Sequence, residues 1–303
     1  MATILITGGT GLVGNHLTKS LIEKGHKVRI LTRSTKQSTN GVDYYRWDVK
    51  QDEIDKQALL GIDSIVHLAG AGVADGAWND TYKEEIINSR VDSIQLLLKN
   101  CKALKSFPKS VISASGTAYY GFDNSDKSYD ESAEAGKGFL TEVSERWEEA
   151  SAGFEQHDVR RVIFRIGVVL SDKGGALTPI KIPFQFGIGS AMGTGKQPLP
   201  WIHIDDLTNG IVEAIERKEI AGIYNAVAPQ RVTSSEFSKT LAQEMKRPFW
   251  APNVPSFVLR IILGKEKADE MLLNGAHVSS KKLEKTGFKF QYPDLGSALR
   301  SLL

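Results

Sequence analysis

The sequence of 303 residues predicts an α/β protein with a doubly wound parallel sheet and a smaller, mostly helical C-terminal part. Apolar, β-branched stretches alternate with helical patterns up to Leu170, which predicts parallel strands joined by right-handed crossovers. After Leu170 the pattern changes to glycine-rich loops, short strands and short helical segments. We therefore expect a first domain over 1–170, to which the chain returns within 200–230, and a substrate domain over 171–303 that ends in a helical segment.

Six stretches of the first part have the length and composition of buried strands: 3–7, 28–32, 42–47, 64–68, 110–113 and 161–165. The helical patterns between them run from Val13 to a C-cap at Gly25, over 79–104, and over 139–157. Farther along, short strands are expected at 201–204 and 222–225, with a helix from an N-cap at Asp205 to Arg217 between them. Three or four short helical segments complete the chain.

Composition and charge exclude several classes of protein. The chain has 38 basic and 36 acidic residues, a net charge of +2, which argues against a nucleic-acid surface. No stretch approaches membrane-spanning length, and the apolar run at Ile4 is a short strand ended by glycines. The single cysteine, Cys101, excludes a disulfide within the chain. We expect a cytoplasmic protein that acts on a small molecule, with no nucleic-acid or membrane partner; the sequence does not predict its oligomeric state.

A glycine pattern follows the first strand directly and opens a helix. Gly8, Gly11 and Gly14 read as Gly-x-x-Gly-x-x-Gly, and Gly9 gives the alternative Gly-x-Gly-x-x-Gly. Such a loop allows a tight turn, close approach of a pyrophosphate, and close packing of helix on strand. The helix N-terminus then favours the phosphate charge. The alternative is a glycine-rich turn that binds nothing. We expect dinucleotide contacts from Gly8, Thr10, Gly11, Leu12 and Val13.

The second strand is followed by Arg33, about twenty residues after the glycines. An acidic residue there would hold the ribose 2′-hydroxyl of NAD, whereas an arginine accommodates the 2′-phosphate of NADP. Arg33 therefore favours NADP(H) over NAD(H), and the alternative is a solvated surface arginine.

Two other strand ends should line the same edge of the sheet. The third strand ends where the adenine ring is expected, and the fourth closes with small residues that suit a backbone passing close to the ribose and pyrophosphate. The candidate cofactor contacts at these ends are Asp48, Val49, Leu68, Ala69 and Gly70.

Several motifs together resemble an atypical branch of the extended short-chain dehydrogenases/reductases, the NAD-dependent epimerase/dehydratase-like proteins named "epimerase family protein". The resemblance covers essentially the whole chain. It implies a Rossmann domain that binds NAD(P), a small C-terminal substrate domain, and Ile166 and Gly167 near the nicotinamide end. The motifs that carry it are 7–14 (TGGTGLVG), 67–70 (HLAG), 112–115 (ISAS) leading to 119–121 (YYG), 165–171 (RIGVVLS), 201–207 (WIHIDDL) and the segment 248–303.

The broader family works through a Ser or Thr and a Tyr-x-x-x-Lys on one helix face, in which the lysine lowers the tyrosine pKa for proton exchange during hydride transfer. Ser115, or less favourably Ser113, supplies the serine. The helix that should carry Tyr-x-x-x-Lys reads FLTEVSERWE over 139–148 and contains neither residue. Tyr119 or Tyr120 is a substitute acid, with an aromatic pair that packs the loop as the alternative. Ser115 has its own alternative, a small residue that caps a strand end.

His203 with Asp205 and Asp206 raises the question of a metal site, and we expect none because no third or fourth ligand is near in sequence. Two classes of function stay open. The first is an NADP-dependent oxidoreductase or epimerase that acts on a carbonyl or sugar-like substrate. The second is a catalytically divergent sensor or regulatory module that binds NADP(H). The well-formed substrate part favours the enzyme, and the missing Tyr-x-x-x-Lys favours the sensor.

Overall fold

Eight strands form the main sheet of the computed structural model, which describes residues 1–34, 37–38 and 41–303. Their order across the sheet is β11-β8-β6-β5-β1-β2-β3-β4. Parallel pairing joins β1 to β2 and β5, β2 to β3, and β5 to β6, whereas the short β4 runs antiparallel to β3. The strands are β1 (Thr3–Thr7), β2 (Lys27–Thr32), β3 (Val42–Asp48), β4 (Glu53–Ile54), β5 (Ser64–His67), β6 (Ser110–Gly116), β8 (Arg160–Ile166) and β11 (Gly222–Ala226). The predicted doubly wound, mostly parallel sheet is confirmed.

The strand order reverses at β1, whose neighbours are β2 on one side and β5 on the other. Both β1 and β5 are buried almost throughout, as their apolar sequences predict. In open α/β sheets of this kind, ligands bind outside the carboxyl ends of the strands at such a switch point. The residues that follow Thr7 and His67 therefore occupy the expected ligand edge.

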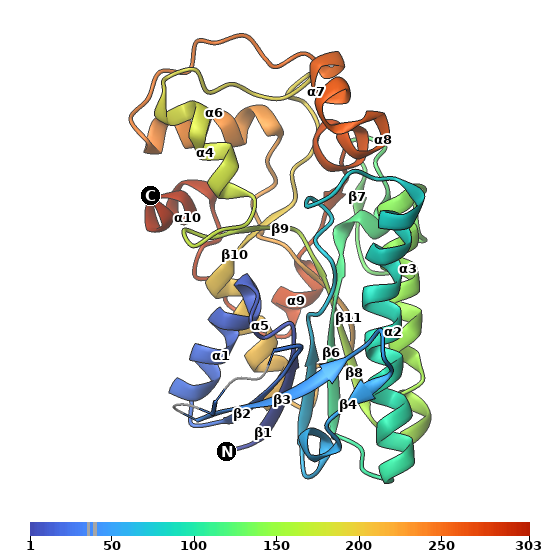
Figure 1. Ribbon diagram of the computed structural model, residues 1–303. Helices are drawn as coiled ribbons and strands as arrows, with labels where there is room; N and C mark the ends of the chain where they lie inside the picture. Colours follow the sequence, from blue (N-terminus) through green and yellow to red (C-terminus); the bar gives the residue numbers. More distant parts are fainter. Residues whose placement is uncertain (35–36, 39–40) are drawn as a thin grey trace. The chain divides into compact units, whose positions relative to one another are not determined.

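Helices cover both faces of this sheet in the first compact unit, which comprises residues 1–115, 145–164 and 208–223. Figure 1 shows α1 and α5 beside one face and α2 and α3 beside the other. Gly25, at φ +80°, ends α1 as predicted, and the His26 amide donates to the Leu21 carbonyl. These helices are α1 (Leu12–Glu23), α2 (Asp80–Leu104), α3 (Phe139–Ala152) and α5 (Ile204–Glu216). The third helix is shorter than predicted, because a separate 3-10 turn, Glu155–His157, follows Ala152.

The second compact unit comprises residues 116–144, 165–207 and 224–303. It holds two pairs of parallel strands, β9 (Val168–Leu170) with β10 (Trp201–His203) and β7 (Ser128–Tyr129) with β12 (His277–Val278). Its main apolar core gathers around Trp201, Leu241 and Leu299. Its helices are α4 (Leu177–Gln185), α6 (Ser234–Glu244), α7 (Ser256–Leu263), α8 (Lys265–Ala268), α9 (Lys281–Lys285) and α10 (Leu295–Leu302). The helix α4 was not predicted; it contains Pro183, and glycine-rich stretches lie on both sides of it.

Candidate functional site

The glycine loop begins at the end of β1, where the Thr7 hydroxyl oxygen accepts hydrogen bonds of 3.2 Å from the amides of Leu68 and Ala69. Gly8 follows with φ +70°, and a Cβ there would lie 2.8 Å from the carbonyl carbon and oxygen of Leu68. Only glycine fits this conformation and this contact. The glycine loop and the chain after β5 are thus packed backbone to backbone.

Gly11 and Gly14 have different roles in this loop. A Cβ at Gly14 would stand 2.3 Å from the Gly8 carbonyl oxygen, so this glycine lets α1 pack against the loop. A Cβ at Gly11 would meet only that same oxygen, at 3.3 Å, and otherwise open space. Gly11 is also the N-cap of α1, and no side chain caps this end. Uncapped amides beside open space are what an anionic group requires.

The other residues predicted in the loop surround this helix end. Thr10 is exposed, and its carbonyl oxygen accepts a 2.8 Å hydrogen bond from the Asn15 side chain. Leu12 and Val13 are half-buried in the first turn of α1, which carries no acidic side chain. No carboxylate of this turn therefore opposes an anion at the helix N-terminus.

Arg33 comes directly after β2 and is exposed. Among the residues that the structure describes, it makes no hydrogen bond or ion pair, so its guanidinium is available to an anion.

Asp48, at the end of β3, folds its carboxylate back onto the amides of Lys50 and Gln51. Val49 packs against the apolar core between the sheet and α2. The carboxylate of Asp48 is therefore partly used within its own turn.

A contact within the protein explains why residue 70 is a glycine. A Cβ there would lie 2.7 Å from the guanidinium carbon of Arg90, a residue of α2. The same guanidinium donates through Nη1 to the carbonyl oxygen of Ala71, at 3.0 Å. The chain after β5 is consequently held between the glycine loop at Leu68 and the Arg90 side chain at Gly70.

His67 is the last residue of β5 and is fully buried. The Trp147 indole can only donate, so its 2.9 Å hydrogen bond makes Nδ1 of His67 the acceptor and places the imidazole proton on Nε2. Nε2 then donates to the Ser93 hydroxyl at 2.7 Å, and Ser93 donates to the Arg90 carbonyl. Burial first, and the Arg90 charge second, lower the pKa of His67 to about 3. The imidazole is therefore neutral at physiological pH.

Ser115 stands near the end of β6, as predicted, and is buried. Its hydroxyl donates to the Glu148 carboxylate at 2.7 Å, and Glu148 is itself buried on α3. The hydroxyl proton is thus committed to Glu148, which leaves the Ser115 oxygen able to accept. Glu148 was not among the residues predicted for the site.

Tyr119 and Tyr120 lie in a 3-10 turn, Thr117–Tyr120, and their rings meet edge to face. The Tyr120 hydroxyl is fully engaged: it donates to the Asn225 side chain at 2.7 Å and accepts from Arg165 at 3.0 Å. Burial raises the pKa of Tyr120 to about 12. The Arg165 guanidinium carbon lies 3.3 Å from the centre of the Tyr119 ring, a cation–π contact.

Ile166 and Gly167 follow Arg165 at the end of β8 and are half-buried. A Cβ at Gly167 would stand 2.7 Å from the Pro200 carbonyl oxygen, and the Gly167 amide donates to Ala226. The tight packing of this turn accounts for a glycine at 167.

The first turn of α3 has a cap that was not predicted. The Glu270 carboxylate accepts 2.8 Å hydrogen bonds from the amides of Phe139 and Leu140. A carboxylate at a helix N-terminus satisfies orphan amides and complements the helix dipole. Glu270 lies 131 positions from Phe139 in a π-helical turn, Asp269–Leu273, so no local pattern could reveal the contact.

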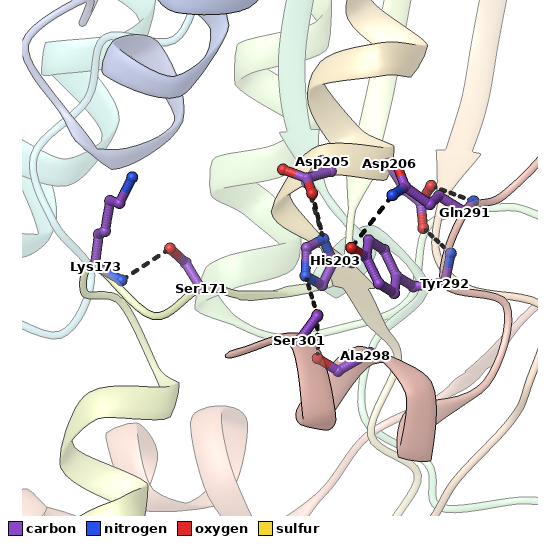
Figure 2. Close-up of polar contacts among 9 residues, drawn as sticks. All are labelled: Ser171, Lys173, His203, Asp205, Asp206, Gln291, Tyr292, Ala298 and Ser301. Atoms are coloured by element: carbon purple, nitrogen blue, oxygen red, sulfur yellow. Dashed lines mark hydrogen bonds and ion pairs between the residues drawn. The ribbon is translucent and has the colours of Figure 1, made fainter. Parts of the chain in front are cut away.

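The His203 cluster links the WIHIDDL motif to the C-terminal segment (Figure 2). The expectation that Asp205 is an N-cap is wrong: α5 begins at Ile204, and Nδ1 of His203 accepts the Asp205 amide. His203 also stacks on Tyr292, with ring centroids 3.8 Å apart, and Nε2 lies 3.1 Å from the Ser301 hydroxyl oxygen.

Asp206 is the buried carboxylate of this cluster, and it accepts the amides of Gln291 and Tyr292 at 2.6 and 3.0 Å. Burial raises its pKa. These contacts give Asp206 a structural function.

Over residues 1–34, 37–38 and 41–303, no group of three or more His, Cys, Asp or Glu is arranged to hold a metal ion.

Comparison with known proteins places the chain in a family. The sequence model of the NAD dependent epimerase/dehydratase family matches residues 4–139, and that of the Domain of unknown function (DUF1731) matches residues 254–302. Epimerase family protein SDR39U1 of Homo sapiens is 34% identical over 99% of this chain and 99% of its own. Epimerase family protein YfhF of Bacillus subtilis (strain 168) is 35% identical over 99% of this chain and 97% of its own. The crystal structure of human SDR39U1 (isoform2) with NADPH matches with a TM-score of 0.89 at 32% identity, over 99% and 98% of the two chains.

The parallel sheet with a glycine loop after its first strand defines an α/β protein of the NAD(P)-binding class. The chain belongs to the NAD dependent epimerase/dehydratase family, among the proteins named epimerase family protein, as its motifs predicted. In the part of the chain that the structure describes, no helix combines the length and apolar character needed to cross a membrane.

Proposed function

We propose that the protein binds NADP(H) in preference to NAD(H) through its first compact unit. The observation that carries the proposal is Gly11, which opens free space at the uncapped N-terminus of α1. The amides of this turn would hold the cofactor diphosphate, and the exposed Arg33 would bind the 2′-phosphate. Asp48, Val49 and the segment 68–70 would contact the adenosine and ribose parts. The NADPH in the crystal structure of the human relative supports this choice of cofactor.

We propose further that the protein is an oxidoreductase or epimerase acting on a carbonyl or sugar-like substrate. Bound NADP(H) would supply or accept the hydride. The Ser115 oxygen, whose proton is held by Glu148, would accept a hydrogen bond from a substrate hydroxyl. Tyr119 is the better candidate acid of the two tyrosines, because the Tyr120 hydroxyl is buried and engaged by Asn225 and Arg165.

A sensor that binds NADP(H) without turnover is the second candidate. The observation in its favour is α3, which carries neither tyrosine nor lysine over Phe139–Ala152. Steady-state turnover of NADPH and NADP+ over a panel of carbonyl compounds and nucleotide sugars separates the two functions. Consumption of one panel member supports the enzyme, whereas tight NADPH binding without turnover of any member supports the sensor.

Arg33→Ala is expected to weaken NADPH binding by about 1.5–3 kcal/mol, the range for a hydrogen bond to a charged group. The NADH affinity should stay nearly unchanged, because NADH has no 2′-phosphate. Isothermal titration calorimetry with both cofactors measures the difference. Equal losses for NADPH and NADH would remove the 2′-phosphate assignment.

Tyr119→Phe is expected to lower kcat by about 10²–10⁴, the usual effect of losing a positioned proton-transfer group. Ser115→Ala is expected to lower kcat by about 10²–10⁴ as well, because the substrate oxygen loses the hydroxyl that orients it. NADPH affinity should change little in both variants. Tyr120→Phe is the matched comparison: it should cost about 1–3 kcal/mol of stability, because it leaves buried partners of the hydroxyl unsatisfied. Full activity in the double variant Tyr119→Phe, Tyr120→Phe would exclude both tyrosines as the acid.

A further inference from the structure

Two segments of the second compact unit, 176–196 and 245–265, carry large apolar side chains that are exposed to solvent. The helix α7, in the second segment, buries none of its residues, although all of them except Ser256 and Arg260 are apolar. Proteins rarely leave many large apolar side chains together in water unless these side chains bind something. The exposed set is Ile182, Phe186, Ile188, Trp250, Phe257, Ile261 and Ile262, of which Phe186 and Ile261 are each 77% exposed.

Hydrogen bonds hold the two segments side by side. The Trp250 indole donates to the Gly187 carbonyl oxygen at 3.1 Å, so the one polar group of this exposed side chain is satisfied within the protein. Farther along, the Gly193 amide donates to the Val254 carbonyl oxygen at 2.9 Å. The second segment then continues directly into α7 (Figure 1). The exposed side chains of the two segments therefore belong to one surface, with the Trp250 ring fixed against the first segment.

The two segments contain basic residues and no acidic residue. Lys246 and Arg247 are exposed, and among the described residues their side chains have no hydrogen-bond or ion-pair partner. Only Arg260 has a carboxylate partner, Asp269, with 2.8 Å between Nε and Oδ1. The positive charge is one-sided here, whereas the whole chain has 38 basic and 36 acidic residues. The basic residues of the two segments are Lys181, Lys196, Lys246, Arg247, Arg260 and Lys265.

An apolar surface accompanied by basic groups matches the surface of a membrane that contains anionic lipids. Large apolar side chains enter the boundary between headgroups and acyl chains, while Lys and Arg attract the anionic headgroups. Tryptophan suits this boundary because its ring is large and amphipathic. A second copy of the chain matches less well, because a two-fold contact would bring the same unpaired basic groups near one another.

We propose that this surface docks the protein reversibly onto membranes that contain anionic lipids. The contact is peripheral: the exposed side chains enter the headgroup boundary, and the chain does not cross the bilayer. The expectation of no membrane partner is revised in this respect, because it considered only membrane-spanning stretches. The proposal does not depend on cofactor binding or on turnover.

Co-sedimentation of the full chain with lipid vesicles tests the proposal. The partition coefficient should be at least about 10-fold larger for phosphatidylcholine vesicles with about 30% phosphatidylserine than for pure phosphatidylcholine, and it should fall at high salt. The double variant Phe186→Ser, Trp250→Ser should lower it about 10- to 100-fold, because two large side chains no longer leave water. The double variant Lys246→Gln, Arg247→Gln should lower it about 10- to 30-fold on the anionic vesicles only.

Matched controls come from the first compact unit. Leu60→Ser removes another exposed apolar side chain, and the double variant Lys19→Gln, Lys102→Gln removes two exposed positive charges. Both controls should bind vesicles as the wild type does. Thermal melts check that every variant is folded, and the exposed, unpartnered Lys246 and Arg247 provide a test that is independent of the apolar pair.

The outcomes separate the membrane from other occupants. Binding that requires phosphatidylserine and is weakened in both double variants of the surface, but in neither control, supports the proposal. Absence of wild-type binding to the anionic vesicles overturns it, and so does unchanged binding by Phe186→Ser, Trp250→Ser. An equal loss in Lys19→Gln, Lys102→Gln also overturns it, because net charge alone would then explain the binding. In sedimentation velocity, a wild-type dimer that Phe186→Ser, Trp250→Ser converts to a monomer would assign the surface to a second copy instead.

Discussion

Gly11→Val is expected to lower NADPH affinity at least about 100-fold, or ~2.8 kcal/mol, while the protein stays folded. A valine side chain would occupy the open space at the N-terminus of α1 that the diphosphate requires. The backbone tolerates it, because Gly11 has φ −80° and ψ 179°, an extended conformation open to any residue. The one close neighbour of the new Cβ is the Gly8 carbonyl oxygen at 3.3 Å, which a shift of a few tenths of an ångström relieves.

Gly14→Ala is the control that separates binding from folding. Its Cβ would meet the Gly8 carbonyl oxygen at 2.3 Å and the Gly9 Cα at 2.6 Å, both backbone atoms. We expect a loss of about 1–3 kcal/mol or more of unfolding free energy, as for overpacked cores. Thermal melts with and without NADPH measure both effects. A normal NADPH-induced rise in melting temperature for Gly11→Val would show that the glycine loop is only structural.

The fold was predictable because local and global signals agree in the first compact unit. β1 and β5 are continuous apolar runs buried almost throughout, and α1 ends at a glycine in the left-handed conformation. The second unit was harder, because its elements are short and depend on tertiary packing. The helix α4, for example, contains Pro183 and buries Leu177 and Phe184 in a core assembled from distant segments.

The candidate site was predictable only where one stretch of chain carries the whole signal. The glycine loop and Arg33 could be found in this way, and their roles in cofactor binding stay predictions. Glu148, Glu270 and Arg90 were missed because each acts through partners distant in sequence, such as Ser115, 33 positions from Glu148. A glutamate or arginine on a helix is most often solvated, so its residue type alone gives no signal. Gly70 is the opposite case, because a ligand was predicted to explain its small size. The Arg90 guanidinium, which lies close to it within the protein, explains the small size as well.

His67→Gln is expected to remove a large part of the acid sensitivity of folding. In the folded protein burial, and next the Arg90 charge, lower the pKa of His67 from 6.5 to about 3. Between these two pH values the unfolded chain binds a proton that the folded protein excludes. The stabilisation by the neutral imidazole is therefore complete above pH 6.5 and declines as the pH falls, by ~1.4 kcal/mol per pH unit below that value.

Glutamine is the suitable replacement because its side-chain oxygen can accept from Trp147 and its amide can donate to Ser93, as the imidazole does. From pH 7 to pH 5 the free energy of unfolding should fall about 2 kcal/mol more in the wild type than in His67→Gln. Urea unfolding at the two pH values measures this difference, and an NMR titration of the His67 Cε1 proton tests it directly. If the Cε1 resonance of His67 titrated near pH 6.5, or if the free energy of unfolding had the same pH dependence in both proteins, neither burial nor the Arg90 charge would lower the pKa of His67.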